Sequence, residues 1–480
     1  MLEGEVPVTA AERARLSAEE LSGGWRLACQ CSVEGDLVIE LRQWDAAILA
    51  DETPFAFEPR PGAGVAVDVG TTTVVAQLLD LQRGCVLAVR TALNSQGRYG
   101  ADVMSRVEFA LSPDGLGELQ RLIRRQIGSL ISQLLLAARV PAHDVRDAVL
   151  VGNTVMHHLF SGIDVEPLSH FPFDPSRTGI EVFSAGELNW ELPSEVLIRF
   201  LPCLGGFVGS DILAGLLATR MAESEDLIAL IDLGTNGEIV LGNREEILCA
   251  STAAGPAFEG ARISMGMRAS AGAISQVAIK DGRLECHVLG SIEAKGICGS
   301  GLVDAVAAGL DLGIISPSGR FADPAHLDEW ILRPPVTLTQ ADVRELQLAK
   351  AAIASGFQLL RERWGGADPV RLYLAGAFGN YVNRSSAHRI GLLSYSPEIV
   401  QPAGNTALLG AKLALFRSDG EDGSYQDLRR RVEHISLSAD PRFQDAFVQE
   451  LSFPVGPTLA SALAGASPGP TGHFVKGDLL

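Results

Sequence analysis

An internal repeat constrains the fold of this chain more than any other feature of its sequence. Residues 65–80 read VAVDVGTTTVVAQLLD, and residues 227–243 read LIALIDLGTNGEIVLGN. In each copy an apolar, β-branched run is followed by Asp-x-Gly-Thr and then by a second apolar run. This pattern predicts a β-hairpin with acidic, glycine and hydroxyl residues at its tip. The copies lie too far apart for a solenoid repeat, and we therefore expect two duplicated lobes.

The residues at the two predicted tips suit the binding of phosphate groups. Gly70 and Gly234 allow a tight turn whose backbone N–H groups can meet phosphate oxygens without an intervening Cβ. Asp68 and Asp232 would repel phosphates, so their presence predicts Mg²⁺, held mostly through water between acid and phosphate. We assign both aspartates a catalytic role as well. Further donors and a third glycine complete the two tips: Thr71, Thr72, Thr73, Thr235, Asn236 and Gly237.

A single Asp-x-Gly-Thr hairpin would be an ordinary turn, because Asp-Gly turns are common in hairpins. Two copies in lobes of comparable size, followed by a glycine-rich strand and turn at 370–383, favour a functional interpretation. Two tips that face each other would clamp a polyphosphate from both sides.

The order of strand and helix signals is typical of an α/β protein, because β-branched runs alternate with helical periods from about 64 to 455. A helix is expected over 115–140, and another begins at Thr339, an N-cap with Asp342 at N3. The expected organisation is a small module, a Pro-rich linker, a first ATPase lobe, a second ATPase lobe and a flexible tail: 1–45, 46–62, 63–206, 207–455 and 456–480.

The charge balance excludes several classes of partner. The chain has 39 Lys and Arg residues against 58 Asp and Glu, a net charge of −19. Such an acidic chain repels phosphate backbones and anionic lipid, so neither nucleic acid nor a membrane surface is an expected partner. The acidic N-terminus has no apolar run, and no 18-residue apolar stretch follows, so we expect a cytoplasmic protein. The seven cysteines are scattered, which argues against a disulfide framework.

The run LAGAFGN at 374–380 looks like an adenosine loop. Together with two phosphate hairpins it resembles the superfamily of acetate kinases, sugar kinases, heat-shock chaperones and actin, whose members bind ATP between two lobes. The resemblance implies an α/β fold of two RNase-H-like (actin-like ATPase) lobes, with ATP and Mg²⁺ as cofactors. A homodimer is common in this superfamily. The loop residues that the resemblance assigns to the nucleotide are Gly376, Ala377, Phe378, Gly379 and Asn380.

Several longer segments are similar, in the same order, to the reductive activators of corrinoid proteins. They include LNSQGRYGADVMSRV (93–107), VGNTVMHHLFSGIDVEPL (151–168), GPAFEGARISMGMRASAGAI (255–274) and GICGSGLVDAV (296–306). The resemblance implies that ATP binding or hydrolysis drives an electron from an iron–sulfur cluster to a Co(II) corrinoid and restores Co(I). The implied partner is a corrinoid (B12-containing) protein. Which corrinoid protein and which electron donor are involved stays open.

The resemblance also directs attention to residues outside the hairpins. Asn153 resembles superfamily turns near the phosphates, and Glu259 is within reach of the nucleotide or its metal. Gly299 and Ser300 open an apolar helix whose N-terminus suits an anion, with close helix packing by glycine as the alternative.

Two histidines, at 157 and 158, follow the turn at Asn153. Adjacent residues on a helix point about 100° apart, so one metal ion is not readily shared by both side chains. We therefore expect a structural role for them.

Two other functions stay open at this stage. A small-molecule kinase of the same superfamily needs a base at the γ-phosphate, and Asp211 is the candidate. An ATP-gated protein-binding module would lack electron transfer altogether. Phosphorylation of a sugar or acid would favour the kinase, and nucleotide-dependent partner binding without hydrolysis would favour the module.

The front end, GGWRLACQCSVEGDLVIEL at 23–41, resembles the last segment of a plant-type two-iron, two-sulfur ferredoxin of β-grasp fold. In that resemblance Cys29 is the final thiolate ligand, and three ligands lie in a loop upstream. No cysteine precedes Cys29 here. We therefore expect a ferredoxin remnant that assembles no 2Fe-2S cluster. Either the sequence begins inside a longer reading frame, which we favour, or the module has degenerated. ATPase and partner binding would survive such a loss, and electron transfer would not.

Overall fold

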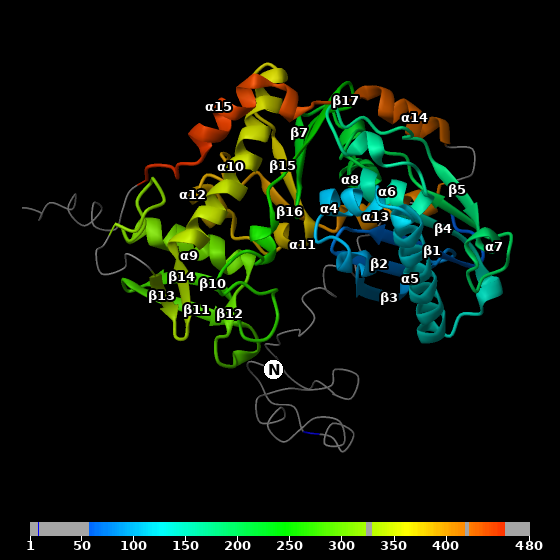
Figure 1. Ribbon diagram of the computed structural model, residues 1–480, viewed down its shortest axis with the longest axis horizontal. Helices are drawn as coiled ribbons and strands as arrows, with labels where there is room; N and C mark the ends of the chain where they lie inside the picture. Colours follow the sequence, from blue (N-terminus) through cyan, green and yellow to red (C-terminus); the bar gives the residue numbers. More distant parts are fainter. Residues whose placement is uncertain (1–7, 9–56, 323–328, 418–421, 457–480) are drawn as a thin grey trace, which may run out of the picture.

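The computed structural model describes residue 8 and residues 57–322, 329–417 and 422–456. The predicted ferredoxin remnant and Cys29 lie outside the described residues. Two six-stranded mixed sheets dominate the described part, one in each of two lobes that stand side by side (Figure 1). The expected two-lobed α/β architecture is confirmed.

The first sheet has the strand order β3-β2-β1-β4-β6-β5. Its first three strands form an antiparallel meander, and β4 and β6 then continue parallel to β1. Nearly every residue of β1 is buried, as expected for a central strand covered on both faces. The strands are β1 (Ala63–Val69), β2 (Thr73–Asp80), β3 (Cys85–Leu93), β4 (Val145–Val151), β5 (Glu181–Ser184) and β6 (Leu197–Phe200).

One face of this sheet is covered by α5 (Gly115–Ala138), the helix predicted from the sequence. Its buried residues recur at helical spacing and pack on the sheet. The apolar face of the helix therefore turns toward the sheet, and its polar face turns toward solvent. Three shorter helices complete the lobe: α4 (Val103–Ala110), α6 (Thr154–Ser161) and α7 (Ala185–Leu188). His157 and His158 lie in α6, and both are buried. His157 packs edge-on against Phe200, which places it in the core of the lobe.

The second sheet repeats this topology. Its order is β16-β15-β7-β8-β9-β17: an antiparallel meander of three strands, with β15 and β16 continuing parallel to its first strand. The duplication seen in the sequence thus extends to five strands of each sheet. The strands are β7 (Ile228–Leu233), β8 (Gly237–Gly242), β9 (Ile247–Thr252), β15 (Arg371–Ala375), β16 (Val400–Gly404) and β17 (Val432–His434).

The long helix α10 (Gln340–Arg363) covers the second sheet. It begins with the predicted capping box, in which Thr339 and Asp342 exchange side-chain and backbone hydrogen bonds. The remaining elements of this lobe are β10 (Ala273–Lys280), β11 (Arg283–Val288), β12 (Gly296–Ile297), β13 (Glu329–Arg333), β14 (Val336–Thr339), α9 (Gly299–Asp311), α11 (Gly376–Gly379), α12 (Arg384–Arg389), α14 (Asp422–Arg431) and α15 (Pro441–Glu450).

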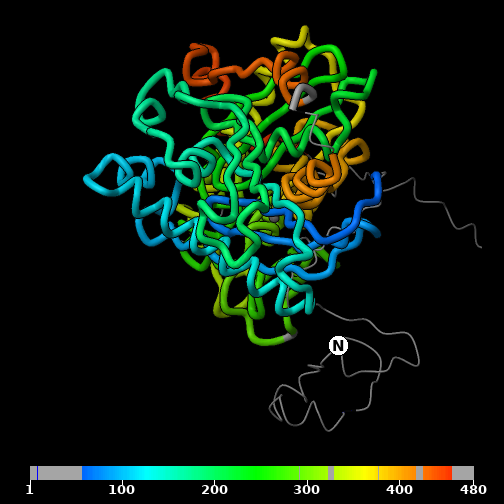
Figure 2. The backbone as a smooth tube through the Cα atoms, turned by 90° about the vertical axis from the view of Figure 1, so that its right-hand side faces the viewer, coloured from blue at the N-terminus to red at the C-terminus, as the bar shows by residue number. Residues whose placement is uncertain are grey.

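Two helices, α8 (Ser210–Thr219) and α13 (Thr406–Leu415), lie between the sheets and join the lobes. Their apolar residues share one core with β1 and β7. In Figure 2 the orange segment that contains α13 lies beside the blue strand β1, although the two are distant in sequence. The helices approach so closely that an ideal Cβ at Gly410 would lie 2.1 Å from the carbonyl oxygen of Ala214.

No helix in the described segments combines the length and apolar character that crossing a bilayer requires.

The close approach of α8 and α13 predicts the effect of adding one methyl group. Gly410→Ala should lower the free energy of unfolding by about 1–3 kcal/mol, because the added Cβ overpacks the crossing. Gly117→Ala is the matched control, since a Cβ at that helical position meets nothing within 4 Å. The control should be neutral or gain about 0.5 kcal/mol. Thermal or urea unfolding measures both, and equal stabilities would show that the crossing does not require glycine.

Candidate functional site

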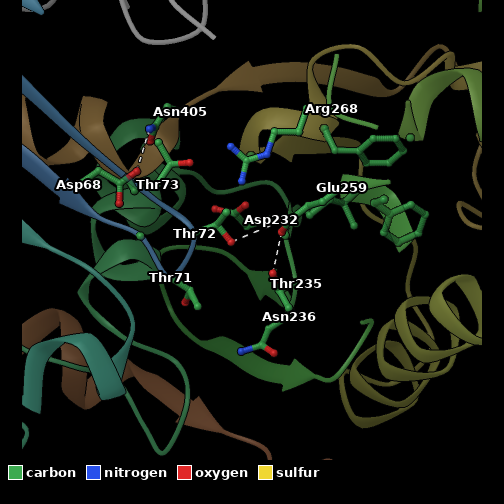
Figure 3. A pocket seen from close by; sticks show the side chains of 18 of the residues that line it. Asp68, Thr71, Thr72, Thr73, Asp232, Thr235, Asn236, Glu259, Arg268 and Asn405 are labelled. Atoms are coloured by element: carbon green, nitrogen blue, oxygen red, sulfur yellow. Dashed lines mark hydrogen bonds between the residues drawn. The ribbon is translucent and has the colours of Figure 1, made fainter. Parts of the chain in front are cut away.

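A cavity of about 310 Å³ lies between the two lobes, and both hairpin tips line it (Figure 3). Asp68 is the penultimate residue of β1, and Asp232 is the penultimate residue of β7. The duplicated topology therefore presents the two aspartates from equivalent positions. The cavity brings together most of the residues singled out from the sequence: Asp68, Gly70, Thr71, Thr72, Thr73, Asn153, Asp211, Asp232, Gly234, Thr235, Asn236, Glu259, Gly299, Ser300, Gly376 and Phe378.

Three of the predicted contact residues whose side chains the structure describes do not line this cavity: Gly237, Gly379 and Asn380. Gly237 is buried in β8, where a Cβ would lie 1.9 Å from the side chain of Ile353 on α10. This glycine permits close packing of a helix on the sheet and does not face the cavity. The side-chain oxygen of Asn380 accepts a hydrogen bond from the N–H of Gly404 at 2.8 Å and so links the end of α11 to the end of β16.

Glu259 connects the two hairpin tips. It ends the short 3₁₀ helix Pro256–Glu259, and its two carboxylate oxygens accept one hydroxyl each. Thr235 donates at 2.6 Å from the second lobe, and Thr72 donates at 3.4 Å from the first. The dashed lines in Figure 3 mark both bonds. A carboxylate thus occupies the hydroxyl donors that were predicted to bind phosphate.

Asn153 and Asn405 each cap a helix at the edge of the cavity and hold a residue of the first hairpin. Asn153 accepts a hydrogen bond from an N–H in the first turn of α6, and its amide donates to the hydroxyl of Thr71 at 2.8 Å. Asn405 caps α13, and its amide donates to the carboxylate of Asp68 at 2.8 Å. The bond from Asn405 crosses from one lobe to the other.

Asp68, Asp211, Asp232 and Glu238 all line the cavity, and burial raises the pKa of each of these four carboxylates. The pKa of Asp68 rises to about 6, with the hydrogen bond from Asn405 working in the opposite direction. The pKa of Asp232 rises to about 7, through burial and then through the charge of Asp68. Asp211, near the start of α8, and Glu238 are also shifted upward by burial and by the neighbouring carboxylates, so that their pKa values lie above the usual range.

The residues of the cavity that the sequence analysis missed include Glu238, Arg268 and Asn405, and also Phe258. Glu238 was within reach of sequence reasoning, because a hairpin with its tip at 234–236 pairs this residue directly with Asp232. Asn405 precedes an apolar helix, as an N-cap does, but its contact with Asp68 depends on the packing of the two lobes. Arg268 lies in an exposed loop with no pattern that would single it out.

Arg268 is the one cationic side chain among the described residues that line the cavity. Figure 3 shows it reaching in from the side of Glu259 toward the hairpin tips. Phe258 and Phe378 lie nearby, and their stacked rings have centroids 4.7 Å apart. The cavity therefore offers one positive charge, an aromatic wall and two sets of hydroxyl and amide donors.

The donor set suits a hard divalent cation held through water. Carboxylate oxygens and water are the ligands that Mg²⁺ prefers. Asp68 and Asp232 supply such oxygens at the bases of the two tips. Within 57–322, 329–417 and 422–456, however, no three His, Cys, Asp or Glu residues are grouped so as to ligate a metal directly. The residues present fit an ion that shares its coordination with water and phosphate.

Comparisons with known proteins identify relatives over most of the chain. A family model for the middle region of RACo matches residues 63–224, and a model for the C-terminal domain of RACo, the ASKHA domain, matches residues 226–462. The corrinoid activation enzyme RamQ of Eubacterium limosum is 35% identical over 437 residues, which cover 84% of this chain and 72% of that protein. The [Co(II) methylated amine-specific corrinoid protein] reductase of Methanosarcina barkeri is 29% identical over 425 residues, 81% of this chain and 77% of that protein.

Among solved structures, a reductive activator for a corrinoid, iron–sulfur protein matches with a TM-score of 0.74 and 35% sequence identity. The match covers 83% of this chain and 67% of that one. Fold and sequence thus agree on the same group of relatives.

The raised pKa of Asp232 predicts a stability change that depends on pH. Its pKa is about 7 in the folded protein against the ordinary 3.8, so folding binds a proton, and stability is lost as the pH rises from about 4 through 7. Asparagine cannot ionise, so Asp232→Asn should be as stable as the wild type at pH 4 and more stable by roughly 1–2 kcal/mol at pH 8. Asp226→Asn, on an exposed turn, is the control. A melting temperature series from pH 4 to 8 tests this, and a pH-independent difference would contradict it.

Proposed function

This chain belongs to the RACo family, and from that premise we propose that it is an ATP-dependent reductive activator of a corrinoid protein. In this function ATP drives the reduction of an inactive Co(II) corrinoid to Co(I). The observation that carries the proposal is the pair of Asp-x-Gly-Thr tips that face one cavity from two lobes of the same topology. The named activities of the relatives supply the corrinoid partner.

The tips provide what a polyphosphate needs. Backbone N–H groups and hydroxyls of the two turns would bind phosphate oxygens from opposite sides. A Cβ at Gly234 would meet only the carbonyl oxygen of Asn236, at 3.5 Å, so there is open space in front of this turn. Asp68 and Asp232 would hold Mg²⁺ through water, and the ion would supply positive charge at the phosphates. Phe258 and Phe378 would flank the base of the nucleotide.

Glu259 competes with a phosphate group for two hydroxyl donors. It already accepts hydrogen bonds from Thr72 and Thr235, so a phosphate group that takes these two donors has to displace the carboxylate. The displaced Glu259 can then turn toward a cation beside the phosphates. Nucleotide binding would in this way replace the link through Glu259 between the two tips by a link through phosphate.

The coupling to cobalt requires two states of the protein with different affinities for their ligands. The reduction of Co(II) to Co(I) has a low potential, so it needs a coupled source of free energy. A nucleotide that binds both tips favours the state in which the lobes are close, and a partner that prefers the same state is affected in turn. The helices α8 and α13 lie between both sheets and would transmit the change.

The electron source is a separate question, because the residues around Cys29 lie outside the described part of the chain. The resemblance of this segment to a ferredoxin is a prediction from the sequence alone, so the assay does not rely on a cluster in this chain. A soluble low-potential one-electron donor therefore has to take the place of the cluster in an assay.

The test is spectroscopic. The purified chain is mixed with a Co(II) corrinoid protein from a relative's system and reduced titanium(III) citrate, and the Co(I) absorbance is followed with and without Mg-ATP. ATP should increase the rate of Co(I) formation, and Asp232→Ala should abolish the increase. A rate of Co(I) formation that does not depend on ATP would overturn the proposal. A cobalt spectrum that this chain leaves unchanged, under conditions in which a relative changes it, would overturn it as well.

One observation keeps a kinase in view as a second candidate. Asp211 lies in the cavity with a raised pKa, and a carboxylate in that place could accept a proton from a hydroxyl that attacks the γ-phosphate. The same arrangement could activate water for hydrolysis. The product of ATP turnover separates the two, because a kinase yields a phosphorylated sugar or acid and an ATPase yields inorganic phosphate.

Arg268 should matter for phosphate binding because it is the cation of the cavity. Arg268→Ala should weaken the binding of Mg-ATP about tenfold, the loss of one charge-assisted contact, and Arg268→Lys should recover part of it. Arg262→Ala is the matched control: this arginine is exposed on the same loop and does not line the cavity. Isothermal titration with Mg-ATP measures all three variants. Equal effects of the changes at 268 and 262 would show that only the overall charge of the loop counts.

A further inference from the structure

The segment 93–107 resembles the corrinoid activators in sequence, and yet none of its residues lines the cavity. It follows β3 and runs through the 3₁₀ helix Ser95–Arg98 into α4. Two of its side chains, those of Asn94 and Arg106, are buried directly behind the first hairpin tip. Their contacts indicate what the segment does.

Asn94 binds the first tip through two groups. Its side-chain amide donates to the carbonyl oxygen of Gly70 at 2.9 Å, and its backbone N–H donates to the carbonyl oxygen of Thr72, also at 2.9 Å. Its side-chain oxygen accepts from the N–H of Gln96 at 3.0 Å. The residue is therefore fully engaged on the side of the tip that faces away from the cavity.

Arg106 binds the carbonyl group of Thr71, which lies between those of Gly70 and Thr72 in the chain. It is 1% exposed, and its Nη2 donates to the carbonyl oxygen of Thr71 at 2.6 Å. Its Nε donates to the carbonyl oxygen of Gly100 at 2.9 Å, so the loop 97–100 closes around the guanidinium. A Cβ at Gly100 would lie 2.7 Å from the backbone nitrogen of Arg106, which explains the glycine there.

Three consecutive carbonyl groups of the tip, at 70, 71 and 72, are thus held from behind. In a planar trans peptide the N–H points opposite to the C=O, so the N–H groups of the next residues must point the other way. In the described part of the chain neither Thr71 nor Thr72 donates a backbone hydrogen bond. The tip therefore presents unpaired N–H groups on the side away from Asn94 and Arg106.

We propose that Asn94 and Arg106 are positioning residues that turn the carbonyl groups of the first hairpin tip away from the nucleotide and so preorganise its N–H groups for phosphate. The proposal rests on the proposed function, because it assumes that the tip binds a phosphate. It extends that function by assigning a role to residues that do not touch the ligand.

The charge of Arg106 contributes as well. The acceptors in hydrogen-bond contact with its guanidinium are neutral: backbone carbonyls, the side chain of Gln96 and the sulfur of Met156. Burial lowers its pKa to about 10, which leaves it charged at neutral pH. Asp102 lies nearby but is engaged with Ser105 at the start of α4. A positive charge behind the tip favours an anion in front of it.

In the segments that the structure describes, no side chain donates a hydrogen bond to a carbonyl group of the second tip, at 234–236. It closes on itself through a hydrogen bond from the N–H of Gly234 to the carbonyl oxygen of Asn236 at 3.0 Å. The two tips are alike in sequence but differ in how they are held. We therefore expect the first tip to be the rigid side of the phosphate site.

The experiment compares Arg106→Met and Arg106→Lys with a matched control, Arg124→Met. Arg124 belongs to the same lobe and also donates to backbone carbonyls, at Phe160 and Ser161, but these lie at the end of α6 and away from the tip. Binding of Mg-ATP and of adenosine is measured by isothermal titration well below the melting temperature of each variant. Far-UV circular dichroism checks the fold.

Arg106→Met should weaken Mg-ATP binding at least tenfold and leave adenosine binding unchanged, because only the phosphates use the tip. Arg106→Lys should fall between, since lysine keeps the charge but cannot reach both carbonyls with a planar fork. Arg124→Met should lower the melting temperature without changing the affinity for Mg-ATP. Asn94→Ala should weaken Mg-ATP binding too, and the double variant should lose less than the sum of the single losses, because both residues hold one turn.

The outcomes separate the two proposals. A wild-type chain that binds no Mg-ATP would overturn the proposed function. A wild type that binds it, together with a folded Arg106→Met variant of the same affinity, would overturn the positioning role alone. If Arg106→Met does not fold, Asn94→Ala and Arg106→Lys decide, and unchanged Mg-ATP affinity in both would overturn the role.

Discussion

The arrangement of this molecule depends on the close crossing of α8 and α13. These two helices fill the space between the sheets, and the glycine at 410 lets one backbone approach the other at Ala214. Each sheet begins with a meander of the same topology, so fixing the helices also fixes how the two hairpin tips face each other. Asp211 in the first turn of α8 and Asn405, the cap of α13, both line the cavity, so the N-terminal ends of the two helices bring partial positive charge to it. A small displacement of α8 relative to α13 would therefore change how the two hairpin tips are placed relative to each other.

The cavity is held in a costly electrostatic state. Burial raises the pKa of Asp68, Asp211, Asp232 and Glu238, and the charges of neighbouring carboxylates raise the pKa of the last three further. Asp232 and Glu238 also pair across one hairpin. Like charges directly opposite each other in a sheet are destabilising. The folded chain would be more stable without them, so their value has to lie in what they bind. A cation that binds together with the phosphates removes this repulsion. The same carboxylates that lower the stability of the free protein therefore favour the bound state.

The sequence was sufficient for the features that are local in the chain. The strand, Asp and Gly order predicted both hairpins, and the capping box at Thr339 predicted the start of α10. It was not sufficient for contacts that depend on tertiary packing. Gly237 belongs to the same sequence string as Gly234, but its place in β8 turns it toward α10. Asn405 and Arg106 meet the first hairpin only because distant segments pack against it, and no spacing in the chain indicates such a contact. Glu238 could have been found, because hairpin register follows from the tip.

The two tips differ in a way that bears on how a nucleotide would move the lobes. The first tip is held by buried donors from its own lobe, and the second is closed by one internal bond. Glu259 joins them through Thr72 and Thr235, and the bond to Thr235 is the shorter of the two. If a ligand replaces Glu259 at both hydroxyls, we therefore expect the second tip to move toward the first. The free energy for that movement is the difference between the new contacts and the two hydroxyl bonds that are given up. A ligand that reaches only one tip gains no such difference, so the movement requires a group long enough to bridge both.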